Sequence, residues 1–277
     1  MMLFVDKGDS MKKYMSLLRM RFISGIQYRS AALAGIVTQY VWGFMLILGF
    51  KAFYDADASA FPMSFDALVS YIWLNQAFLA MFMPWITDTD ILESIRDGSV
   101  AYELCRPVQL YPMWFYKSMA NRLSRAVLRC FPIIIAALFL PRPFKLLAPS
   151  DFGALSAFLL SLFIGFLLVV AFGMITYIIT FYTLSSNGIR IVIIGTVEFF
   201  AGSIIPLPFF PENIRKIVEL LPFASMQNVA LRIYSGDIIG IEIIFRIVLQ
   251  LFWFIAIYLI GNYLMRKAMR HVVIQGG

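Results

Sequence analysis

Six apolar stretches, separated by short polar connections, restrict what this chain can fold into more than any other feature of its sequence. They cover residues 31–53, 66–86, 122–140, 152–183, 190–210 and 238–265. The hydrocarbon core of a bilayer is about 30 Å thick, and about 20 apolar residues in a helix cross it. The sequence therefore predicts an all-α membrane protein with six transmembrane helices.

Two of these stretches differ from the usual length of a span. The third begins with Arg122, Arg125 and Arg129, so its purely apolar part is short. We expect these three side chains to snorkel to the membrane interface. The fourth, 152–183, is longer than a bilayer requires, so we expect it to tilt or to extend beyond the bilayer.

The composition favours the same class of protein. Hydrophobic residues make up 61% of the chain and charged residues 14%, whereas charged residues are about 25% of an ordinary soluble domain. No polar stretch is long enough to form a separate soluble domain. We therefore treat residues 1–277 as a single transmembrane domain.

Positive charges lie mainly on one side of the predicted membrane. The segment before the first span, the connection between the second and third spans, and the tail after the sixth each carry several Lys and Arg residues. On the other side, 54–65 has none and 141–151 has only Arg142 and Lys145. Because short loops rich in Lys and Arg stay in the cytoplasm, both termini are predicted to be cytoplasmic. The net charge of +7 follows from this bias, which favours anionic lipid over nucleic acid as a partner.

An amphipathic basic helix is predicted at 11–28, before the first span. Its apolar residues share one face of a helical wheel, with basic and polar residues largely opposite; the apolar set is Met11, Tyr14, Met15, Leu18, Phe22 and Ile26. This pattern is typical of a helix that lies in the interface of the cytoplasmic leaflet. It does not resemble the short charged start of a cleavable signal peptide. Translation could begin at Met1 or at Met11.

The densest charged block of the chain is 91–108, ILESIRDGSVAYELCRPV, on the cytoplasmic connection between the second and third spans. Its pattern predicts a helix, a break at Gly98, a second short helix and an end at Pro107. Such an element would lie across the membrane surface and present charged side chains to a soluble partner. A solvated amphipathic loop is the alternative.

A second irregular segment, 206–237, follows the fifth span. It contains four prolines and is expected to form two short helices, 212–221 and 224–234. Each is too short to span a bilayer and too apolar for a free loop. We expect a re-entrant pair that dips into the outer leaflet against the spans. Two interfacial helices that lie flat are the alternative.

Several motifs of enzymes and nucleotide-binding proteins are absent from the sequence. It contains no GxxxxGK[ST], no HExxH and no GxSxG, and its one histidine, His271, lies in the tail. Cys105 and Cys130 suggest neither a disulfide framework nor a metal site. We therefore predict no catalytic, cofactor or metal site in this chain, and expect a soluble partner to supply any energy.

Polar residues inside the spans are candidates for a substrate path, because an unpaired polar group in hydrocarbon is costly. The candidates are Gln39, Trp42, Asn75 and Glu198. Glu198 is the strongest candidate, because a carboxyl group deep in a span needs a partner. A hydrogen bond to a neighbouring helix, without any contact to substrate, would equally explain its presence. Glu242 and Arg246 are spaced i, i+4 and are predicted to pair with each other. Few acids lie in the spans, which disfavours an ion-coupled carrier.

The order of these features resembles an ABC-2-type permease, the membrane subunit of a type V ABC exporter. Two strings carry the resemblance, IRDGSVAYELCRP and PLPFFPENIRKIVELLPF. The resemblance implies two separate cytoplasmic ATPase subunits that bind ATP and Mg, and a second permease chain, identical or related. It also implies a multi-pass protein of the bacterial inner membrane, with export of a hydrophobic or amphipathic substrate such as a drug, antimicrobial, peptide or lipid.

The resemblance also assigns residues. The charged surface that docks on the ATPase would consist of Glu93, Arg96, Asp97, Glu103 and Arg106. Its apolar anchors would be Ile95, Val100 and Leu104, with Gly98 permitting the break. An outer gate would be sealed by Phe209, Phe210 and Phe223. An ion-coupled carrier and a membrane scaffold or intramembrane enzyme are the alternatives, and the sequence does not name the substrate.

Overall fold

The computed structural model describes residues 7–27, 29–183 and 187–271, which form helices and turns without a strand. The α-helices, in chain order, are α1 (Lys7–Ile26), α2 (Arg29–Ala56), α3 (Phe65–Phe82), α4 (Thr89–Arg96), α5 (Val100–Leu104), α6 (Leu110–Phe139), α7 (Phe152–Thr183), α8 (Asn187–Phe200), α9 (Glu212–Val218), α10 (Asn228–Tyr234) and α11 (Ile241–Ala268). Three short 3₁₀ turns complete them: η1 (Ala58–Ala60), η2 (Leu207–Phe209) and η3 (Met269–His271). The all-helical class is confirmed.

Four helices of the described residues are long and apolar enough to cross a membrane. They are Ala32–Ala56 within α2, all of α3, all of α7 and all of α11. Helix α7 has the bounds expected for the fourth apolar stretch. Its 32 residues make a helix about 48 Å long at about 1.5 Å per residue, well beyond the hydrocarbon core.

Helix α6 is longer than the span expected at 122–140, because it begins at Leu110. Arg122, expected to snorkel, is instead buried at 3% exposure. Its guanidinium donates to the carbonyl oxygens of Met81, Met83 and Ile86 at 3.1, 2.8 and 2.8 Å. These carbonyls belong to the last turn of α3 and the connection after it, where a helix leaves its acceptors unpaired. Arg122 thus caps α3.

The helix in the fifth apolar stretch is shorter than the predicted 190–210, because α8 ends at Phe200. The chain turns at Gly202, whose φ of 71° is in the left-handed region that favours glycine. Tyr71 and Asn75 of α3 hold this turn. The Tyr71 hydroxyl donates to the Gly202 carbonyl at 3.1 Å, and the Asn75 amide donates to that of Ser203 at 3.4 Å. Tertiary hydrogen bonds therefore stabilise a break that the apolar sequence does not reveal.

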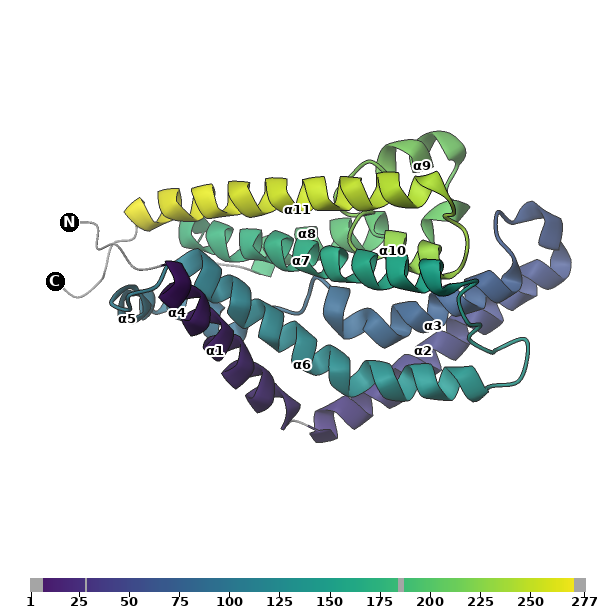
Figure 1. The fold of residues 1–277 in the computed structure, drawn as a ribbon, viewed down its shortest axis with the longest axis horizontal. Helices are drawn as coiled ribbons and strands as arrows, with labels where there is room; N and C mark the ends of the chain where they lie inside the picture. Colours follow the sequence, from purple (N-terminus) through teal and green to yellow (C-terminus); the bar gives the residue numbers. More distant parts are fainter. Residues whose placement is uncertain (1–6, 28, 184–186, 272–277) are drawn as a thin grey trace.

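The helices lie side by side in one elongated bundle (Figure 1). Helix α11 packs along α7, and α6 lies between α1 and α3. At one end, hereafter the α4 end, lie α1, α4, α5 and the last turns of α11. At the opposite end, hereafter the α9 end, lie η1, α9 and α10. Helix α1 crosses α6 where a Cβ on Gly25 would lie 2.2 Å from the Ser124 hydroxyl, so the crossing requires glycine.

Candidate functional site

Helix α4 begins the charged segment predicted at 91–108. The Asp88 carboxylate accepts a hydrogen bond from the backbone N–H of Asp90 at 3.1 Å and so caps the helix. The apolar residues of α4 follow the i, i+3, i+4 pattern of an amphipathic helix and are buried, with α7 packed against the helix; they are Ile91, Leu92 and Ile95. Local sequence thus fixes both the start of α4 and the face it buries.

Gly98 separates α4 from α5. Its φ of 77° is in the left-handed region that residues with a Cβ rarely adopt. The Asp97 carboxylate accepts a hydrogen bond from the backbone N–H of Ser99 at 2.8 Å, and this bond lowers the pKa of Asp97. The break therefore occurs at the glycine expected from the sequence.

Glu103 of α5 is directed into the chain rather than toward solvent. Its carboxylate accepts hydrogen bonds from the Trp114 indole N–H and the Lys117 ammonium, both on α6. The side chains of Glu103 and Lys117 are only 15% and 6% exposed. This corrects the expectation that Glu103 is part of a docking surface. Its observed contacts attach α5 to α6.

The start of α4 is also attached to α7. The Tyr177 hydroxyl accepts a hydrogen bond from the backbone N–H of Asp88 at 2.8 Å. Burial raises the pKa of the Asp88 carboxyl and nearby Asp90 raises it further, while Arg21 and Lys117 oppose them. With the Glu103 contacts, this bond connects the α4–α5 element to α6 and α7, and Arg122 of α6 holds the connection that leads into α4.

The outward side of the α4–α5 element keeps most of the predicted charges. The exposed charged residues are Glu93, Arg96, Asp97 and Arg106. They lie at the α4 end of the bundle (Figure 1). We refer to these four residues with Tyr102 and Leu104 as the α4–α5 surface.

The apolar anchors differ from the prediction. Ile95 and Val100 are buried, at 6% and 1% exposure, because they hold the element to its own chain. Leu104 is exposed at 43%, as a contact for a partner requires. Tyr102, which was not among the predicted residues, is 79% exposed. Its position two residues after a buried valine, on the opposite side of a helix, was the available signal.

The four residues expected in a substrate path do not converge. The Gln39 side chain is buried, and its amide atoms have no hydrogen-bond partner among the described residues. Trp42, on the same helix, is 54% exposed, while Asn75 holds the Ser203 turn. Glu198 has a buried Oε1 without a described partner. Within the described chain none of the four hydrogen-bonds to another, so their joint role stays a prediction.

The segment 206–237 folds back against the long helices at the α9 end. Its second helix, α10, is buried against α7 and α3, whereas α9 exposes apolar side chains. A Cβ on Gly165 of α7 would lie 1.9 Å from the Met226 carbonyl oxygen, so only glycine allows this approach. The Gln250 amide of α11 donates to the Ser225 carbonyl at 2.8 Å. Both short helices are present, and both are shorter than predicted.

The three phenylalanines expected in an outer gate pack in different places. Phe209 lies against Phe50 and Phe61, with ring centroids 5.3 and 5.7 Å away. Phe210 is buried against α8, and Phe223 packs on α7 and α8. No ring contact among the three is seen in the described residues, so within one chain they do not form a single plug.

An ion-pair network fastens this segment to α11. The Glu219 carboxylate pairs with Arg232 and Arg246, both at 2.5 Å. Arg232 also pairs with Asp237, and Arg246 with Glu242 at 2.8 Å. The predicted Glu242–Arg246 pair is confirmed. Glu219 was missed because no helical spacing relates it to either arginine.

We expect Glu219→Gln to destabilise the protein by about 1.5–3 kcal/mol, the usual contribution of hydrogen bonds to a charged group. The substitution removes the carboxylate shared by two nearly buried guanidinium groups, each of which keeps one other carboxylate partner. The midpoint of thermal unfolding in detergent measures the loss. Glu212→Gln is the matched control, because Glu212 forms an exposed pair with Lys216. Equal midpoints for both variants would contradict a structural role for the network.

The same network predicts a dependence on pH. Burial raises the pKa of Glu219, but Arg232 and Arg246 outweigh it and hold the pKa below its ordinary 4.5. A lowered carboxyl pKa contributes stability above the ordinary value and loses it as the pH falls through the lowered one. The difference in unfolding midpoint between wild type and Glu219→Gln should therefore shrink as the pH falls below 4.5.

Taken together, the long apolar helices, the irregular segment packed at the α9 end and the charged element at the α4 end define a polytopic helical membrane protein. The sequence profile described as ABC-2 family transporter protein matches residues 40–276. The chain therefore belongs to this family of ABC transporter membrane components, which have no ATPase of their own. A comparison with curated protein sequences gives no match.

Proposed function

We propose that this chain is the permease subunit of an ATP-driven exporter and that the α4–α5 surface is where a separate cytoplasmic ATPase docks. The main support is that the element carrying this surface is attached to the long helices of the bundle. Its exposed charges belong to an element that contacts α6 through Glu103 and α7 through Tyr177, and Arg122 of α6 binds the carbonyl of Ile86 in the connection just before it. A force applied to the surface is therefore transmitted to α6 and α7 together.

The ATPase supplies the chemistry in this proposal. Two ATPase subunits bind ATP and Mg, and a second permease chain, identical or related, completes the complex. The cargo is hydrophobic or amphipathic, such as a drug, antimicrobial, peptide or lipid, and moves outward across a bacterial inner membrane. Resistance to drugs or antimicrobials would be the expected benefit to the cell.

We further propose six membrane crossings, with α6 and the segment 187–210 added to the four candidate spans. Helix α8 is too short to cross alone, but the turn after it is held against α3, and irregular backbone is tolerated at membrane depth when protein covers it. An even number of crossings agrees with the positions of α1 and the last turns of α11 at one end (Figure 1). That end would be cytoplasmic, where its basic residues are favoured.

Co-purification tests the docking proposal. The chain is expressed with a candidate ABC ATPase from the same genome, and the complex is isolated through a tag on the permease. We expect stable co-purification and ATP hydrolysis stimulated in lipid vesicles. Arg96→Glu should prevent both, since a like charge set against a complementary surface costs several kcal/mol. Arg142→Glu, an exposed reversal outside the α4–α5 surface, is the control.

Failure of the wild-type chain to bind or stimulate the ATPase would leave the carrier and scaffold alternatives. Equal binding by both charge-reversal variants would place the docking surface elsewhere on the chain.

The separate packing of Phe209 and Phe210 leads to a prediction about the gate. Phe209→Ala should raise substrate leak and basal ATP hydrolysis while the complex still assembles, because Phe209 is only partly buried between α2 and η1. Phe210→Ala is the comparison. Phe210 is 9% exposed in a small cluster, so its truncation should mainly lower the free energy of unfolding, by about 3–5 kcal/mol. A Phe209→Ala variant that behaves as wild type would place the gate elsewhere.

A further inference from the structure

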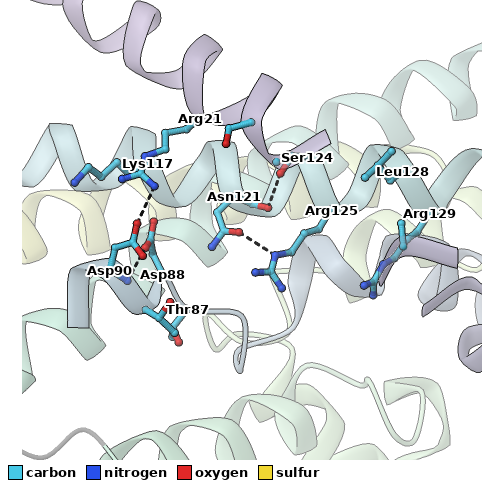
Figure 2. A pocket seen from close by; sticks show the side chains of 14 residues that line it. Arg21, Thr87, Asp88, Asp90, Lys117, Asn121, Ser124, Arg125, Leu128 and Arg129 are labelled. Carbon is cyan, nitrogen blue, oxygen red and sulfur yellow. Dashed lines mark hydrogen bonds and ion pairs between the residues drawn. The ribbon is translucent and has the colours of Figure 1, made fainter. Parts of the chain in front are cut away.

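A cavity of about 410 Å³ lies among α1, the start of α2, the α3–α4 connection and α6 (Figure 2). It adjoins the corner where the chain leaves α1 and enters the first candidate span. No residue of the α4–α5 surface lines it. Its charged lining consists of Arg21, Lys117, Arg125, Arg129, Asp88 and Asp90.

Two of the four basic side chains have acidic partners. Arg21 pairs with Asp90 at 2.9 Å, and Lys117 pairs with Glu103. The remaining acid, Asp88, is committed to the cap of α4. These groups close the end of the cavity next to α4 and leave little unbalanced charge there.

The other two basic side chains meet no carboxylate in the described part of the chain. Arg125 donates through Nε to the Asn121 side-chain oxygen at 2.9 Å. The Nε of Arg129 is buried without a hydrogen-bond partner among the described residues. An unsatisfied buried donor costs about 1–3 kcal/mol, and no carboxylate of the described chain balances either guanidinium charge, so this half of the cavity favours an anion.

The geometry suits an anion with an apolar tail. Arg125 and Arg129 are four residues apart and therefore lie on one face of α6, with both guanidinium groups on the same side in Figure 2. Gly35 makes room for Arg129 against α2, because a Cβ there would lie 2.5 Å from the Arg129 Cζ. Leu128 and Ala32 provide an apolar wall beside the two charges.

We propose that this cavity binds the phosphate of an anionic phospholipid from the leaflet at the α4 end, with Arg125 and Arg129 as the phosphate ligands. Guanidinium groups bind phosphate oxygens through paired N–H donors, and basic pockets between membrane helices bind lipid headgroups. A lipid fits better than free phosphate, because the apolar wall and the adjoining first span accommodate an acyl chain. Since α1 forms one wall, the bound headgroup would hold α1 on α6. The proposal requires a membrane-embedded chain and does not depend on ATP-driven export.

Native mass spectrometry of the purified protein in detergent tests this proposal by titration with phosphatidylglycerol, phosphatidylcholine and inorganic phosphate. Wild type should bind phosphatidylglycerol most tightly. The Arg125→Gln, Arg129→Gln double variant should bind it about 30-fold more weakly, if each arginine contributes what a basic side chain near an anionic leaflet usually does. Arg19→Gln, Arg266→Gln removes two exposed charges outside the cavity and should leave the affinity unchanged.

The site would be overturned if both double variants bound phosphatidylglycerol equally weakly, or if both bound it as tightly as wild type. Competition by inorganic phosphate at the same concentration as the lipid would overturn the assignment to a lipid. A second measurement uses the unmodified protein and so does not depend on the folding of variants. A phosphatidylglycerol with a photoreactive headgroup should crosslink to peptides of α1 and α6 that contain residues 21–25 and 121–129, and crosslinks confined to other peptides would contradict the proposal.

Discussion

ATP-driven transport is expected to be lost in a Gly98→Val variant that still inserts into the membrane and folds. Gly98 has a φ of 77°, and nothing lies within 4 Å of the position of an added Cβ. The defect would therefore come from the backbone rather than from a clash. A β-branched residue in the left-handed region costs about 1–3 kcal/mol, which is enough to change the angle between α4 and α5 and so to disrupt the α4–α5 surface.

The matched variant is Gly98→Asn, because asparagine tolerates the left-handed region far better than valine. It should retain most of the transport activity. Gly49→Val in α2 controls for the added bulk, since a Cβ there also meets nothing within 4 Å and its φ is not in the left-handed region. ATP-dependent uptake into inverted vesicles, normalised to the amount of assembled protein, is the measurement. Equal uptake by Gly98→Val and Gly98→Asn would show that the break is not required.

Much of the fold could be predicted because membrane spans and caps are local signals. The apolar length of 152–183 gives α7 directly, and Gly98 marks where the helical segment at 91–108 breaks. Hydrogen bonding in a bilayer must be satisfied within a helix, so a long apolar stretch leaves few alternatives. The α4–α5 element was likewise visible, since its amphipathic period and its glycine both lie within a few residues.

The remainder depends on contacts between residues far apart in the chain. The end of α8 is set by Tyr71 and Asn75 of α3, which lie more than a hundred residues before the turn that they hold. The inward direction of Glu103 depends on Lys117, although the pair looks like ordinary surface charge in the sequence. Burial decides which charged residues are structural, and burial is a property of the folded chain. A single sequence therefore overestimates how many charges are free to bind a partner.

Arg122 is the clearest such case and gives the second large expected effect. Arg122→Met should lower the stability of the protein by several kcal/mol. It removes the donor for three carbonyl groups around the end of α3, and each buried carbonyl left unpaired costs about 1–3 kcal/mol. Thermal unfolding in detergent measures the loss. Arg266→Met, an exposed arginine on α11, should change the midpoint little.

The Arg122→Lys variant tests whether the positive charge alone is sufficient or whether the forked shape of the guanidinium is also needed. A lysine keeps the positive charge, but its single ammonium cannot reproduce the fork by which two nitrogen atoms of Arg122 reach Met81, Met83 and Ile86. We expect it to recover part of the stability but little of the transport, because the cap connects α3 to the chain that leads into α4. ATPase binding should persist in this variant, since the α4–α5 surface is unchanged. Full transport by Arg122→Lys would show that the charge alone is sufficient and that the cap does not carry the coupling between α3 and α4.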